Sequence, residues 1–102
     1  MVDLVEAEQS PLARQRLAVT LFHAGRVEEA ETLFRALTAL PTVDVTAWGY
    51  LGVIAEQRGD EARARSCYGE VIVRDPQGEA GRLARRRLAA LGPAGPGDPR
   101  DE

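Results

Sequence analysis

The sequence predicts an all-α fold of antiparallel helix-turn-helix repeats, closed by a C-terminal capping helix. Of its 102 residues, 44% are hydrophobic and only 5% aromatic, and its many Ala and Leu residues favour helices. The glycines Gly25 and Gly59 lie thirty-four residues apart, and the chain matches itself at that spacing. Between them, apolar residues recur at the i, i+3, i+4, i+7 positions of amphipathic helices.

The internal match places residues 11–44 over residues 45–78 without a gap. Seven pairs agree in size and polarity: Leu17 with Leu51, Ala18 with Gly52, Leu21 with Ala55, Gly25 with Gly59, Ala30 with Ala64, Phe34 with Tyr68, and Leu37 with Val71. A period of this length is typical of stacked repeats. We therefore expect two repeats, one over residues 11–44 and one over residues 45–78.

The first repeat is predicted to contain helices over residues 11–24 and 27–40. Ser10 is suited to cap the first helix, and the proline that follows it fits the first helical turn. Gly25 can adopt the left-handed conformation that ends a helix, and Pro41 stops the second helix.

The second repeat is predicted to contain helices over residues 45–58 and 61–74. Asp44 and Asp60 stand at the two capping positions, and Gly59 separates the helices. Because the connections are only two to five residues long, neighbouring helices must be antiparallel.

A fifth, capping helix is expected over residues 77–91, where one apolar stripe recurs at helical spacing. The stripe consists of Ala80, Leu83, Ala84, Leu88 and Leu91. Residues 92–102 are rich in Gly and Pro and are expected to form a disordered tail. Residues 1–9 could form an arm or a short helix.

Charge and composition exclude several classes of protein. The net charge of −3 argues against nucleic-acid binding, and no apolar run is long enough to span a membrane. All thirteen bases are Arg, which suggests a high-GC bacterial source. With no export signal visible at the N-terminus, we expect a cytoplasmic protein.

The sequence offers no constellation for catalysis. His23 is the only histidine, so a two-histidine metal site is impossible, and Cys67 is the only thiol. No glycine-rich phosphate loop is present. We expect Cys67 to be buried as a small hydrophobe, and we predict neither an enzyme nor a cofactor or metal.

The second repeat carries a specific motif. It reads Trp48-x-x-Leu51-Gly52, followed by Gly59, Ala64, Tyr68 and Pro76. These residues resemble the tetratricopeptide repeat, and the resemblance covers about residues 11–78. It departs at Ala55 and Val71, and Arg14 stands where the first repeat would have tryptophan.

Small residues recur where the helices of such a pair would meet. They are Ala18 and Gly52 on the first helices and Ala30 and Ala64 on the second helices. Small side chains let the two backbones approach closely. Phe34 and Tyr68 would then fill the space toward the next unit, and Trp48 would pack against the preceding helix.

The resemblance implies a curved stack whose concave side is lined by the first helix of each repeat. That side would present Leu12, Gln15, Arg16, Val19, Phe22 and His23 from the first repeat, and Thr46, Gly49, Tyr50, Val53, Glu56 and Gln57 from the second. Its apolar stripe indicates a binding surface for a peptide or helix. Self-association or cover by residues 1–9 are the alternatives, and His23 could instead serve only the dipole of its helix.

We therefore predict a protein-interaction module, an adaptor or chaperone-like scaffold, that binds a protein or peptide partner. The clamp with which some family members bind acidic C-terminal tails is missing, because Gln15, Val19, Gly49 and Val53 occupy its positions. The first alternative is a homo-oligomeric structural unit, such as a homodimer. A less favoured alternative is an anionic ligand bound by the Arg82, Arg85, Arg86 and Arg87 cluster, which we interpret as a solvated capping face.

Overall fold

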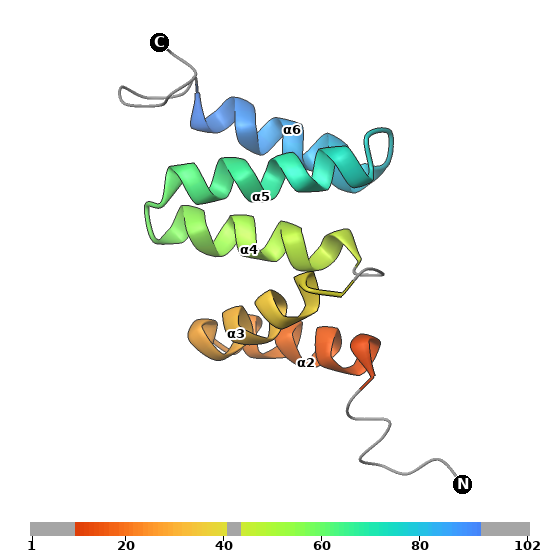
Figure 1. Ribbon diagram of the computed structural model, residues 1–102. Coiled ribbons are helices and arrows are strands. Elements are labelled where there is room, and N and C mark those ends of the chain that lie inside the picture. The colour runs from red at the N-terminus through yellow and green to blue at the C-terminus, as the bar shows by residue number, and fades with distance from the viewer. Residues whose placement is uncertain (1–9, 41–43, 93–102) are drawn as a thin grey trace, which may run out of the picture.

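The structure is a computed structural model that describes residues 10–40 and 44–92. Within these residues it contains five α-helices and no strand, which confirms the predicted all-α fold. The helices are α2 (Pro11–His23), α3 (Val27–Thr38), α4 (Val45–Gln57), α5 (Glu61–Arg74) and α6 (Glu79–Leu91). They stack in chain order, so that α6 lies at the opposite end of the molecule from α2 (Figure 1).

Some of the predictions fall on residues outside those described. They concern the arm at residues 1–9, the helix stop at Pro41 and the tail beyond Gly92. The helix boundaries elsewhere differ from the predicted ones by at most two residues, and those of α5 agree at both ends. The fifth helix, for example, begins at Glu79 rather than at residue 77.

The predicted helix ends are held by the residues that the sequence indicates. The side chains of Ser10 and Asp60 each accept a hydrogen bond from the backbone N–H three residues later, at 3.1 and 3.2 Å. Asp44 accepts one from the backbone N–H two residues later, at 3.0 Å. Gly25 and Gly59 have φ angles of 87° and 76°, the left-handed conformation that favours glycine. These caps satisfy groups that the helix ends would otherwise leave unpaired.

The small residues lie at the helix seams, as predicted. Ala18, Ala30 and Ala64 are fully buried, and Gly52 is buried as well. A Cβ atom at Gly52 would lie 2.6 Å from Cε1 of Tyr68, closer than real side chains approach. The close packing of α4 against α5 therefore depends on a glycine at this position.

The two repeats are joined through aromatic packing. The ring of Phe34 on α3 is fully buried and stacks on Tyr50 of α4, with 5.0 Å between ring centroids. Trp48, also on α4, packs against the two clusters of buried residues that form the core, one around Phe34 and the other around Tyr68. It lies under the guanidinium of Arg74. The large side chains therefore fill the space between units, as the sequence predicts.

Equivalent positions in the two repeats differ in burial. Leu51 is 6% exposed because α3 packs against α4 from the N-terminal side. Leu17, its counterpart on α2, is 52% exposed, since no helix of the described chain precedes α2. Burial at this repeat position is therefore supplied by a neighbouring helix.

α6 is fixed against α5 at both of its ends. At its start, a Cβ atom on Gly81 would lie 1.9 Å from the carbonyl oxygen of Asp75, so the two backbones are in direct contact. At its end, Arg65 of α5 donates a hydrogen bond of 2.8 Å to the carbonyl oxygen of Gly92. α5 therefore packs against both α4 and α6, and α6 also contacts α4. None of the described helices has the length and apolar character that a membrane crossing requires.

Candidate functional site

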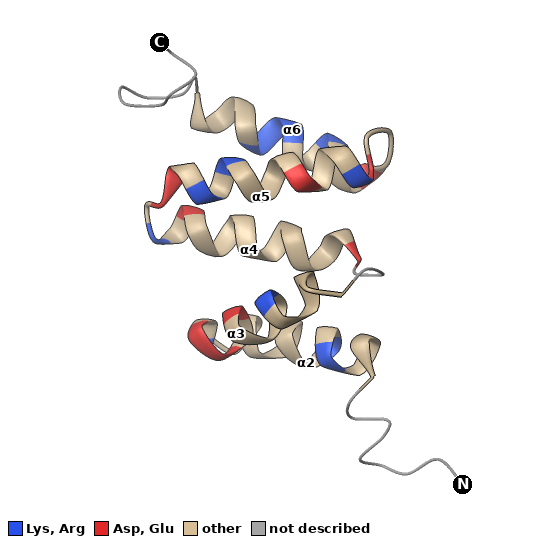
Figure 2. Ribbon diagram, in the orientation of Figure 1, with Lys and Arg blue, Asp and Glu red and all other residues tan. Residues whose placement is uncertain are grey.

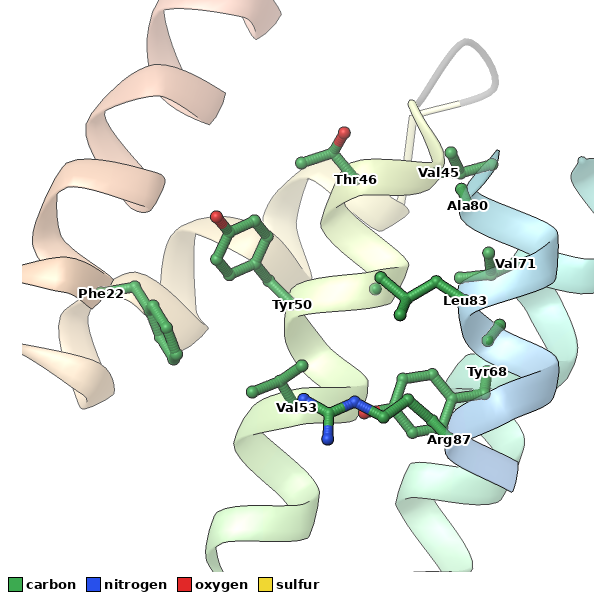
Figure 3. Close-up of a pocket in the computed structure, with 12 residues that line it drawn as sticks. Phe22, Val45, Thr46, Tyr50, Val53, Tyr68, Val71, Ala80, Leu83 and Arg87 are labelled. Carbon is green, nitrogen blue, oxygen red and sulfur yellow. The ribbon is translucent and has the colours of Figure 1, made fainter. Parts of the chain in front are cut away.

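A hollow of about 350 Å³ opens between α4 and α6, above α5. We call it the inner hollow. α4 contributes Val45, Thr46, Gly49, Tyr50 and Val53, α6 contributes Ala80, Leu83, Ala84 and Arg87, α5 contributes Tyr68 and Val71, and α2 contributes Phe22. Figure 3 shows that these side chains come from separate helices and face a common space. Its volume and mostly apolar walls are typical of a site for a small side chain or ligand.

One face of α4 forms the first wall. Thr46, Gly49, Tyr50 and Val53 follow the i, i+3, i+4, i+7 spacing that places side chains along one side of a helix. A Cβ atom at Gly49 would meet no atom within 4 Å. The hollow is therefore open at this glycine, and a larger side chain there would enter it.

The edge next to α2 is aromatic. The ring of Tyr50 meets Phe22 edge to face, with centroids 5.1 Å apart, while its other side stacks on Phe34. Its hydroxyl forms a hydrogen bond of 3.2 Å with Nε2 of His23. Three contacts from two helices thus hold this side chain in one orientation, so this edge of the hollow is formed before any ligand arrives.

The floor of the hollow contains a polar network. The hydroxyl of the buried Tyr68 donates a hydrogen bond to Glu56, and Nε of Arg87 lies 3.8 Å from the same carboxylate. Burial, together with the hydrogen bond to Glu56 and the charge of that group, raises the pKa of Tyr68. Tyr68 therefore remains a neutral donor, and Arg87, whose side chain is 46% exposed, keeps N–H groups open to solvent.

The wall formed by α6 was missing from the sequence prediction. The capping-helix interpretation treated the arginines of this helix as a solvated face, whereas Arg87 lines the hollow together with the 53% exposed Leu83. The spacing of Leu83, Ala84 and Arg87 at i, i+1 and i+4 places them on one side of a helix, but it does not show which helix that side faces.

The predicted site residues fall into two groups. Phe22, Tyr50 and Val53 line the inner hollow, as do the predicted surface residues Thr46 and Gly49. The others lie outside it: Leu12, Arg16, His23 and Gln57 are exposed, and Gln15, Val19 and Glu56 are partly buried. His23 and Glu56 do not line the hollow themselves, but they form hydrogen bonds with Tyr50 and Tyr68, which do.

The opposite side of the molecule carries a more polar hollow. A hollow between α3 and α5 is lined in part by charged side chains, including Arg35, Asp60 and Arg63. Cys67 lies beneath it and is buried, as predicted, and burial raises the pKa of its thiol. Within the described residues, no group of three His, Cys, Asp or Glu side chains could hold a metal ion.

The comparison with protein families agrees with this arrangement of helices. The tetratricopeptide repeat matches residues 3–43 and, in a second match, residues 16–80. The two matches together cover more than half of the chain. Searches of curated proteins and of solved structures gave no match.

Proposed function

Because the chain belongs to the tetratricopeptide repeat family, whose repeats generally mediate protein–protein interaction, we propose that it binds a segment of a partner protein in the inner hollow. In this proposal it is a non-enzymatic adaptor or chaperone-like scaffold of the cytoplasm. The observation that carries the proposal is the open, mostly apolar space beside Gly49, between two helices that the fold holds apart.

The walls of the hollow favour binding without a large rearrangement. Tyr50 is fixed by Phe22, Phe34 and His23, and Tyr68 is fixed by its hydrogen bond to Glu56. A site whose side chains are already ordered loses less conformational entropy when the ligand binds. An apolar side chain of the partner would supply the binding energy by leaving water.

A homo-oligomer remains the second candidate because two leucines of α2 are exposed in the part of the chain that the structure describes. Leu12 and Leu17 are both more than half exposed. Stacking α2 of one copy on α6 of another would, however, bring Arg14 and Arg16 toward the arginines of α6. Like charges in such an interface oppose association. Light scattering that finds a monomer at micromolar concentration would remove this candidate.

The substitution Gly49→Leu tests the proposed function. It places a side chain in the inner hollow, and because leucine favours helix more than glycine does, α4 should be stabilised. We expect the variant to keep its helical circular dichroism and to lose its partner in an affinity capture from the source cell.

Gly69→Leu is the matched control. Gly69 lies within α5, a Cβ atom there would also meet nothing within 4 Å, and it does not line the inner hollow. The proposal predicts that this variant retains every partner that Gly49→Leu loses. Equal capture by the two folded variants would place binding elsewhere on the protein.

A further inference from the structure

The helices α2, α4 and α6 together carry an excess of positive charge. α2, α4 and α6 together contain six arginines and two glutamates, a net charge of +4. The two outer helices, α3 and α5, contain four arginines and five glutamates, a net charge of −1. The helices around the inner hollow are therefore basic, although the whole chain has a net charge of −3.

The hollow itself has little negative charge to offset these arginines. Along the hollow, α4 is uncharged between Asp44, which caps its start, and Glu56 near its end (Figure 2). The carboxylate of Glu56 already accepts a hydrogen bond from the hydroxyl of Tyr68 and lies close to Arg87. Arg87 is the one charged residue among the described residues that line the hollow. A cleft with low-dielectric walls strengthens the attraction between such a charge and an anion.

The arginines of α6 do not form a single anion-binding site. Arg82 and Arg85 donate hydrogen bonds to the backbone carbonyls of Gln77 and Pro76, in the turn that precedes the helix. Arg87, by contrast, points across the hollow toward Val53 (Figure 3). Of the four arginines, this one is placed to meet a group bound between α4 and α6.

We propose that the partner segment is an acidic amphipathic peptide, with an apolar side chain in the inner hollow beside Gly49 and a carboxylate on Arg87. This inference rests on the proposed function, since it names the chemistry of the ligand that the same hollow takes. A guanidinium forms its strongest hydrogen bonds with carboxylates, and an apolar anchor matches the remaining walls. The hollow lies between two helices, so a flat anionic membrane could not reach its floor.

Two synthetic peptides of about twelve residues provide the test, because helix-in-groove ligands present anchors at i, i+3, i+4 and i+7. Both have leucine at those positions; one has glutamate at the others, and its counterpart has lysine. In a fluorescence titration of the full chain, we expect the glutamate peptide to bind at least about tenfold more tightly than the lysine peptide. The difference should shrink as salt is added, because salt screens exposed charges.

Arg87→Gln and Arg86→Gln form a matched pair for the charge contact. Both remove one positive charge from α6, but only Arg87 lines the hollow. We expect Arg87→Gln to lower the affinity for the glutamate peptide about tenfold, and Arg86→Gln to lower it less than about threefold. Equal losses in the two variants would overturn the proposed contact with Arg87.

The two levels of the proposal fail in different ways. If both peptides bind with equal affinity and Gly49→Leu abolishes the binding of both, the hollow is the site but the proposed preference for acidic ligands is wrong. If Gly49→Leu leaves the glutamate peptide bound with unchanged affinity, the hollow is not its site, and the proposed function fails with it. If neither peptide binds, the inference is overturned in favour of a hollow covered by the chain itself or by a second copy.

Discussion

Two glycines of α4 have opposite roles, although they lie only three residues apart. Gly52 faces α5, where a Cβ atom would lie 2.6 Å from the ring of Tyr68. Gly49 faces the inner hollow, where a Cβ atom would meet nothing within 4 Å. The first glycine is therefore required by packing, whereas the second leaves space that a ligand can use.

Alanine at each glycine should thus change stability in opposite directions. We expect Gly52→Ala to lower the free energy of unfolding by about 1–3 kcal/mol, because the ring of Tyr68 is held by Glu56 and cannot yield freely. Gly49→Ala should raise it by about 0.5–1 kcal/mol through helix propensity alone. Urea denaturation measures both, and a stabilised Gly52→Ala variant would mean that α4 and α5 are packed differently.

Ion pairs connect the helices as well as strengthening each one. Glu31 of α3 accepts hydrogen bonds from Arg35 on its own helix and from Arg58, the first residue after α4. Its side chain is only 13% exposed. Burial alone would raise the pKa of Glu31, but the hydrogen bond from Arg58 and the charges of the nearby arginines outweigh it and lower that pKa.

The link through Glu31 should therefore make the free energy of unfolding depend on pH. A carboxyl group with a lowered pKa in the folded state stabilises the fold above its unfolded pKa, about 4.3, and loses that contribution as the pH falls. We expect Glu31→Gln to be less stable than the wild type by about 1 kcal/mol at neutral pH. This difference should shrink below about pH 4.

Thermal unfolding at several pH values measures this difference, with Glu28→Gln as the control. Glu28 is an exposed glutamate in the first turn of the same helix, and it should show no comparable change. A Glu31→Gln difference that stays constant down to low pH would contradict the link between α3 and α4.

At the scale of the whole molecule, local signals predicted the elements well. Capping residues and left-handed glycines mark the helix ends, because they act within a few bonds of the backbone. Small residues at a fixed spacing predicted the seams, since helical periodicity determines which side chains face each other. The all-α fold could therefore be predicted from the sequence.

The site could be predicted only in part, because it depends on contacts between distant helices. Leu17 and Leu51 occupy the same repeat position, yet only Leu51 has a helix packed over it. Arg87 was missed for a similar reason, since its helix departs from the repeat pattern and was interpreted as a solvated cap. That α6 forms a wall of the hollow follows from its packing against α5, which no local pattern encodes.

Amide chemical shifts of the isotope-labelled protein, recorded while the glutamate peptide is added, test the central claim most directly. If the inner hollow binds the peptide, shifts should change most at Thr46, Gly49, Val53 and Leu83, and little at Ser66 and Gly69 on α5. Changes concentrated at Ser66 and Gly69, with the walls of the hollow unaffected, would contradict the account.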